Sequence, residues 1–176
     1  TKSTDGTLTV FTNPLNVTGT LSLATDNVIV DVQSVDFTIA TLAFVGSPAE
    51  IPNATFRLTG QQATQTITTV TSGGTVVNDA NMTNNPDLAD GIFEYYGAAG
   101  GTIRLTVFPN LRIAGSGIFS VPAVATINVY RDILLDAGTL AEGAGSIIRL
   151  QRNFDSRNGG GFSAGTGRLQ FFGNNA

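Results

Sequence analysis

Apolar and polar residues alternate with a period of two along most of this chain, and this alternation constrains the fold more than any other feature. Residues 7–12 read Thr-Leu-Thr-Val-Phe-Thr, and residues 15–23 place Val17, Leu21 and Leu23 on one face. Side chains two positions apart lie on the same face of a β-strand, so the pattern predicts strands with one buried face. Thr and Val are β-branched, which favours strand over helix.

The alternation predicts about a dozen short strands, separated by turns at Gly, Pro and Asn. Evidence for helix is limited to short turns within residues 87–96 and 133–142. We therefore expect an all-β fold, an antiparallel β-sandwich or jelly roll of about 10–12 short strands, forming one domain over residues 1–176. The expected strands cover residues 7–12, 15–23, 28–32, 35–45, 54–59, 64–71, 75–77, 102–108, 111–121, 123–135, 146–150 and 168–172.

A weak internal repeat is also present. Residues 8–15, LTVFTNPL, resemble residues 105–111, LTVFPNL, and an apolar segment that contains glycine follows each. The match suggests a duplication with halves at 8–99 and 105–176. The alternative is that strands rich in Thr and Val resemble one another through composition alone.

The residue inventory closes most routes to catalysis. The chain has no Cys, His or Trp, so it offers no thiol nucleophile and no imidazole base or metal ligand. Carboxylates remain, but the 13 acidic residues are scattered along the chain. We expect no enzymatic activity and assign no catalytic residue. An enzyme would need two carboxylates about 5–10 Å apart in a cleft.

Charge and hydropathy exclude two classes of partner. The formal net charge is −4, and the basic residues form no cluster that would neutralise phosphates. Uninterrupted apolar stretches are too short to span a bilayer. We therefore expect neither nucleic-acid binding nor membrane insertion.

Calcium is the one cofactor for which the sequence offers ligands. An irregular stretch at residues 78–99 carries oxygen-bearing side chains of the kind that Ca²⁺ prefers. Its spacing does not match an EF-hand, and a solvated turn in which Asn and Asp cap their own backbone is the alternative. The candidate calcium ligands are Asp79, Asn81, Asn84, Asp87 and Asp90.

Surface location is indicated by composition. The chain starts at Thr1 and is poor in Lys and rich in Thr, Asn and Gly, so we expect a secreted protein from which a leader has been removed. Glycosylation sequons occur at Asn16, Asn53 and Asn81, which is the number that chance predicts.

Unprotected strand edges suggest what such a protein does. Charged residues make up 12% of the chain and Lys2 is the single lysine, so little is available to guard edges against other strands. The first segment, residues 1–12, is a candidate detachable strand that pairs with a neighbouring copy. We expect a structural subunit that self-assembles with copies of itself into a filament, tube or shell. The assembly strand is Thr7, Leu8, Thr9, Val10 and Phe11.

Two aromatic pairs are open to more than one interpretation. Phe171 and Phe172 are either core residues or an exposed anchor for a neighbouring molecule. Tyr95 and Tyr96 are the candidate aromatic platform if the chain is instead an extracellular carbohydrate-binding or adhesin module.

Overall fold

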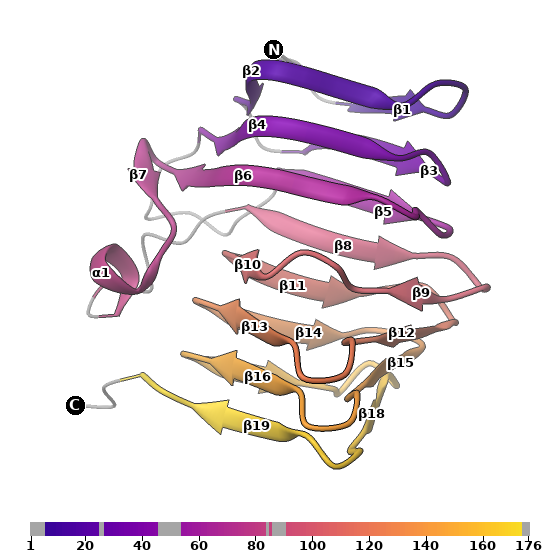
Figure 1. Ribbon diagram of the computed structural model, residues 1–176, viewed down its shortest axis with the longest axis vertical. Coiled ribbons are helices and arrows are strands. Elements are labelled where there is room, and N and C mark those ends of the chain that lie inside the picture. Colours follow the sequence, from indigo (N-terminus) through magenta and orange to yellow (C-terminus); the bar gives the residue numbers. More distant parts are fainter. Residues whose placement is uncertain (1–5, 25–26, 46–53, 84, 86–90, 174–176) are drawn as a thin grey trace.

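The computed structural model is built of strands that stack in one direction (Figure 1). The strands expected at residues 102–108, 111–121 and 123–135 are each divided into two shorter strands, and those at residues 92–96, 139–141, 153–155 and 161–163 were not expected. Almost all of its regular structure is β-strand, as the alternation predicts. The described residues are 6–24, 27–45, 54–83, 85 and 91–173.

Each turn of the chain contributes one strand to each face, and the strands follow one another in chain order. The first three turns contain β1 (Gly6–Val10), β2 (Leu15–Leu23), β3 (Val28–Gln33), β4 (Phe37–Phe44), β5 (Thr55–Thr59) and β6 (Gln65–Ser72), followed by β7 (Thr75–Val76) and α1 (Asp79–Met82). The later turns contain β8 (Ile92–Tyr96), β9 (Gly101–Thr102), β10 (Val107–Phe108), β11 (Asn110–Ile113), β12 (Ile118–Ser120), β13 (Thr126–Val129), β14 (Asp132–Leu135), β15 (Thr139–Ala141), β16 (Ile147–Leu150), β17 (Asn153–Asp155), β18 (Gly161–Ser163) and β19 (Arg168–Phe171).

The strand pairing makes the fold a parallel β-solenoid of about 7 turns. One sheet contains seven strands in the order β1-β3-β5-β8-β11-β14-β17, and every pair in it is parallel. Among the described residues, the pairing of β6 with β7 is the one antiparallel contact. The prediction of an antiparallel sandwich or jelly roll is therefore wrong, because both folds require antiparallel neighbours throughout.

The short helical turns expected at two places are not found in the described residues of those segments, and residues 87–90 lie outside the described residues. Residues 133–142 contain β14 and β15, and the described part of residues 87–96 contains β8. The one helix of the described chain is α1, within the stretch expected to be irregular. Its N-cap is Asn78, whose side chain accepts a hydrogen bond from the Asn81 amide. This is the usual way in which Asn starts a helix.

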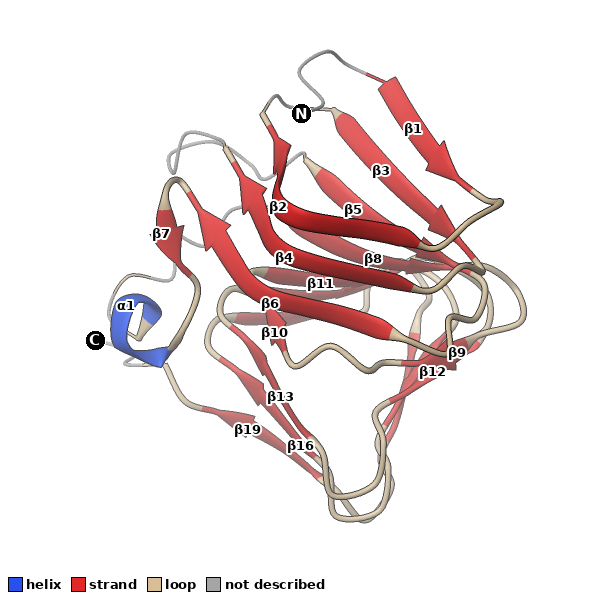
Figure 2. Ribbon diagram, turned by 45° about the horizontal axis from the view of Figure 1, so that its top comes forward, coloured by secondary structure: helices blue, strands red, loops and turns tan. Residues whose placement is uncertain are grey.

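The cross-section of the solenoid changes between the third and fourth turns. In the first three turns the strand opposite the seven-stranded sheet is long, and β2, β4 and β6 lie side by side there (Figure 2). From the fourth turn on, two shorter strands replace it, and they form the sheets β9-β12-β15-β18 and β10-β13-β16-β19. We call the early turns two-sided and the later turns three-sided. The duplication into residues 8–99 and 105–176 stays a prediction.

Interior side chains form columns because the strands stack in register. One column contains Leu8, Val30, Phe56, Phe93 and Leu111, each paired with the next. Of these, only Leu8 is substantially exposed. The column brings aromatic rings into edge-to-face contact, a favourable geometry for ring pairs.

Glycines allow the turns to approach closely at one corner. A Cβ atom on Gly115 would lie 2.1 Å from the Gly97 nitrogen, and one on Gly138 would lie 2.1 Å from the Gly115 oxygen. Gly138 also has a φ of +61°, which favours glycine. Part of the glycine content therefore follows from turn-on-turn stacking.

Phe93 is the side chain whose loss should cost the most, because its ring has three edge-to-face partners. The ring centroids lie 5.6 Å from Phe44, 5.8 Å from Phe56 and 5.3 Å from Phe108. We expect Phe93→Ala to lower the free energy of unfolding by about 3–5 kcal/mol in chemical denaturation, because it leaves a cavity in a packed interior. Val124→Ala is the control, since Val124 is 84% exposed. Equal losses in the two variants would contradict the packing described here.

Candidate functional site

Among the described residues, no strand pairs with the outer edge of the first strand of the solenoid. Thr7, Leu8, Thr9 and Val10 lie in β1, with Phe11 directly after it. β1 pairs with β3 of its own chain on one edge, and it is the first strand of its sheet. Leu8 is 46% exposed although it stands in an interior column, and Phe11 is 66% exposed. This end therefore presents interior side chains to the surroundings.

In the described residues, this end has few of the features with which β-proteins usually protect an edge. Residues 6–23 contain no Asp, Glu, Lys or Arg. β2 is the first strand of its own sheet, and its interior residues Leu15, Val17 and Leu21 are only partly buried. Exposed strand edges are normally blunted by charge, proline or a covering segment. Pro14, just outside β2, is the one such residue here.

The C-terminal end is also apolar, but charged side chains flank it. Phe154, Phe162 and Leu169 stand in interior columns and are partly buried, and Phe171 is 59% exposed below Leu150. The centroids of the Phe154 and Phe162 rings lie 5.4 Å apart. The charged residues of this last turn are Arg152, Asp155, Arg157 and Arg168.

Asp155 and Arg157 form an ion pair at this end. Arg157 Nη2 lies 2.6 Å from an Asp155 carboxylate oxygen. Hydrogen bonds from the Arg157 side chain and backbone lower the pKa of Asp155 to about 2. The terminal strand β17 thus carries an ionised carboxylate at ordinary pH, a charge of the kind that disfavours pairing along that strand.

The outer face of the seven-stranded sheet carries a ladder of alternating charge. Asp31, Arg57, Glu94 and Arg112 are paired in register along successive strands. Arg57 Nε lies 2.5 Å from Glu94, and Arg112 Nη1 lies 3.3 Å from the other oxygen of the same carboxylate. Arg112 also binds Asp136. Glu94 and Asp136 are therefore engaged in ion pairs along the side of the solenoid, while Asp31 accepts hydrogen bonds from Gln33 and Thr59.

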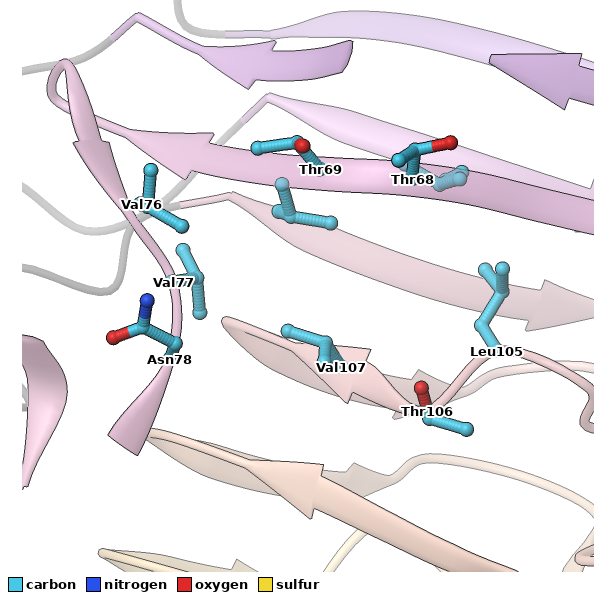
Figure 3. A pocket seen from close by; sticks show the side chains of 10 residues that line it. Thr68, Thr69, Val76, Val77, Asn78, Leu105, Thr106 and Val107 are labelled. Carbon is cyan, nitrogen blue, oxygen red and sulfur yellow. The ribbon is translucent and has the colours of Figure 1, made fainter. Parts of the chain in front are cut away.

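A slot lies where the cross-section changes, between β6 and β10. Figure 3 shows Thr68 and Thr69 on β6 above Leu105, Thr106 and Val107, with residues 76–78 at one side. Its volume is about 260 Å³, and no charged residue lines it. β7 covers only the last two residues of β6, so the two sheets are not joined here.

The Asn- and Asp-rich stretch contributes α1, which is anchored to later turns. Asp79 accepts a hydrogen bond from the Tyr130 hydroxyl at 2.6 Å and one from Arg149 at 3.1 Å. Gln151 Nε2 donates to the Met82 and Thr83 carbonyls at 2.7 and 2.6 Å, and Met82 is fully buried. The carboxylate of Asp79 therefore holds the helix against the solenoid.

The calcium hypothesis is not decided by this geometry. Asn84, Asp87 and Asp90 lie outside the described residues. The Asn81 side-chain amide donates to the Val76 carbonyl at 2.9 Å. Among the described residues, no group of three His, Cys, Asp or Glu side chains is placed to hold a metal ion. Calcium binding stays a prediction.

The tyrosine pair is split by the fold. Tyr95 points into the core, where it is 1% exposed, and its hydroxyl donates to Gln65 Oε1 at 3.0 Å. Burial raises the pKa of this hydroxyl. Tyr96 is 44% exposed, and the Arg57 guanidinium lies 4.9 Å from its ring centroid. Only Tyr96 is placed to meet a ligand.

The remaining sequence candidates are dispersed. The sequon residues Asn16, in β2, and Asn81, in α1, are exposed, whereas Asn53 lies outside the described residues. Phe172 packs against Tyr130, with ring centroids 5.9 Å apart, while its neighbour Phe171 is exposed. Phe172 thus packs against the body of the protein, while a role of Phe171 as an anchor for a neighbouring molecule stays a prediction.

Sequence reasoning missed the apolar C-terminal end as a surface. Phe154, Phe162 and Leu169 look like ordinary strand residues in the sequence. A repeat of 21 or 22 residues would have grouped them. They follow their strand partners Ile133, Leu140 and Ile148 at that spacing.

Comparisons with protein-family models, with curated proteins and with solved structures found no match to this chain. In the described part of the chain, no helix has the length and hydrophobicity needed to cross a membrane. Functional inference therefore rests on the solenoid itself.

Asp79 generates a pH-dependent prediction. Hydrogen bonds from Tyr130 and Arg149 hold its pKa below the ordinary value. A carboxyl group with a lowered pKa in the folded state stabilises the fold above its unfolded pKa of about 4, and this contribution is lost as the pH falls through the folded pKa. We expect Asp79→Asn to cost at most about 1 kcal/mol at pH 7, because the side chain is half exposed and water screens the pair.

Thermal unfolding of the wild type and of Asp79→Asn, at pH 7 and again at pH 2.5, measures this contribution. The two proteins should differ at pH 7, and the difference should be smaller at pH 2.5, which lies below the unfolded pKa. Asp155→Asn, which breaks an exposed ion pair far from α1, is the control for loss of charge alone. A difference that persists unchanged at pH 2.5 would show that the ionised carboxylate of Asp79 is not what anchors α1.

Proposed function

We propose that this protein is a structural subunit that self-assembles with copies of itself at an extracellular surface, and that the ends of its solenoid are the assembly surfaces. The observation that carries the proposal is the exposure of interior columns at both ends. Leu8 is 46% exposed at one end and Phe171 is 59% exposed at the other.

The physical reason is that a solenoid turn is stable through contact with its neighbours. Repeat proteins usually carry terminal turns with a polar outer face, since an apolar terminal turn promotes association. Covering a side chain such as Leu or Phe contributes about 1.5–3 kcal/mol. A second copy, placed on an open end, continues both the hydrogen-bond ladder and the hydrophobic columns.

The sides of the solenoid offer less for assembly. The charge ladder from Asp31 to Arg112 is satisfied within the chain.

Because β1 pairs with β3 of its own chain, the proposal uses the free outer edge of β1 and does not need the strand to leave its sheet. Calcium-assisted assembly remains part of the proposal through the candidate ligands of residues 79–90.

Assembly is tested with charge placed on the ends. We expect wild-type protein to form particles whose mass rises with concentration in light scattering, and which are visible in electron micrographs. Leu8→Lys and Phe171→Lys should each lower the mean particle mass at a given concentration. Each variant weakens the contact made by its own end by at least about tenfold, because burying the new charge costs more than about 1.4 kcal/mol.

Val124→Lys is the matched control, since Val124 is 84% exposed and lies in a loop between β12 and β13. It should assemble as the wild type does. A monodisperse wild-type monomer at high concentration, with and without calcium, would refute the proposal. Circular dichroism on each variant confirms that the fold is retained.

A carbohydrate-binding module is the second candidate, and the exposure of Tyr96 favours it. A hollow of about 330 Å³ lies beside Tyr96, with a floor of small residues that would let a flat ligand approach the ring. Its other lining residues are Gly97, Ala98, Ala114, Gly115, Ser116 and Ala137.

Glycan binding is expected to be lost in Tyr96→Ala and retained in Tyr96→Phe, because stacking on a sugar needs the ring and not the hydroxyl. A glycan array probed with both variants and the wild type measures this. Failure of the wild type to bind any glycan would remove this candidate.

A further inference from the structure

We infer that the primary contact between copies joins two N-terminal ends, with β1 antiparallel to β1 of the second copy and β2 antiparallel to its β2. This inference rests on the proposed function, and specifies which end meets which. Two independent observations carry it, namely the distribution of charge and the shape of the cross-section.

Charge separates the two ends of the solenoid. Among the described residues of the first turn, 6–24 and 27, no side chain is charged, while Lys2, Asp5 and Asp26 lie outside the described residues. The C-terminal turn carries Arg152, Asp155, Arg157 and Arg168 next to its strands. Docking the C-terminal end onto any partner would desolvate some of these charges, at a cost that is recovered only through well-placed partners. The described residues of the N-terminal turn offer no such partners, so they match best with the same uncharged residues of a second copy.

Shape separates the ends as well. The N-terminal turn is two-sided, with the long strand β2 opposite β1, whereas the C-terminal turn is three-sided. A head-to-tail contact would place unlike cross-sections on one another. Two N-terminal ends have the same cross-section, so a two-fold axis normal to the sheets superposes β1 on β1 and β2 on β2.

The junction inside the chain shows what an unlike contact requires. Where the third turn meets the fourth, Gln65 Nε2 donates to the Thr102 carbonyl at 2.9 Å, while Gln65 Oε1 accepts from the Arg104 amide at 3.2 Å. The buried side-chain amide of Gln65 thus forms hydrogen bonds with two backbone groups. These groups have no partner in a strand ladder, because the cross-section changes here. In the first turn, the same column holds Leu15, which pairs with Phe37 as Phe37 does with Gln65. Leu15 has no polar atom with which to do this.

An antiparallel contact also suits the free edge of β1. Its backbone groups on that edge face no strand in the described chain, and antiparallel pairs are at least as stable per residue as parallel ones. Leu8 of one copy would then lie opposite a residue of the same face of β1 in the other copy, which is Gly6, Leu8 or Val10. The contact is isologous and closes at two copies.

A mixing experiment tests the polarity of the contact. Leu8→Lys blocks the N-terminal end, and Phe171→Lys blocks the C-terminal end. We expect Leu8→Lys to be displaced strongly toward monomer, with at least tenfold weaker association, and Phe171→Lys to be a dimer in light scattering. A mixture of the two, with one copy tagged, should give no tagged–untagged pairs.

The other outcomes distinguish a failure of this inference from a failure of the proposed self-assembly. If each variant is a monomer and the mixture forms one-to-one pairs, the contact is head to tail, and the inference fails while self-assembly stands. If Leu8→Lys dimerises and Phe171→Lys does not, two C-terminal ends meet, and the inference again fails alone. If the wild type is a monomer at every concentration, both fail, and something other than a second copy covers this end.

Cysteine cross-linking tests the antiparallel pairing directly. The chain has no native cysteine, so any disulfide reports an introduced pair. Thr7→Cys and Thr9→Cys, oxidised separately and as a mixture, should give a cross-linked dimer in at least one combination, because opposed antiparallel residues have Cα atoms about 4.5–5.5 Å apart. Thr126→Cys, exposed in the middle of the molecule, is the control. A dimer in solution with no cross-link in any combination would overturn the antiparallel contact.

Discussion

Stacking of each turn on the next is the interaction on which this protein depends. A single turn encloses too little volume to bury its own interior side chains. Phe93 is fully buried because Phe56 lies on one side of it and Leu111 on the other, in adjacent strands of one column. Leu8 has Val30 on one side only, and it is half exposed. Burial in this fold is therefore set by position along the stack more than by hydrophobicity.

In-register stacking also constrains the outer surface. Parallel pairing places the same position of successive turns about 4.8 Å apart, so like charges in one column would repel. The column that contains Asp31, Arg57, Glu94 and Arg112 alternates in sign, and Glu94 is 2% exposed between two arginines. Glu94 and Arg112 each take part in two ion pairs, so a few charged residues form a continuous network. The low charge content, which the sequence analysis interpreted as poor edge protection, is thus partly explained by charged residues that share ion-pair partners in this column.

Strands could be located from the sequence because alternation is a local property. The expected strands at residues 15–23, 28–32 and 54–59 correspond closely to β2, β3 and β5. Their pairing could not be obtained from alternation, since a strand buried on one face looks the same in a sandwich and in a solenoid. The spacing between Ile148 and Leu169 carries the missing information, but the long segment between β6 and β8 interrupts that spacing in the middle of the chain. The candidate surface at Leu8 and Phe11 was predictable from composition, whereas the one at Phe154 and Phe162 required the stacking.

The change of cross-section explains why a helical segment interrupts the solenoid. β6 and β10 belong to different sheets, and the slot between them marks a break in the ladder. The chain leaves the stack at this break, and α1 binds Tyr130, Arg149 and Gln151, which belong to the fifth and sixth turns and the segments that follow them. These contacts between α1 and later turns replace part of the stabilisation that a continuous strand ladder would supply at the break. The same reasoning applies to contacts between the ends of two copies. A contact between ends of different cross-section needs additional polar groups or a bridging segment such as α1, whereas a contact between ends of the same cross-section needs neither.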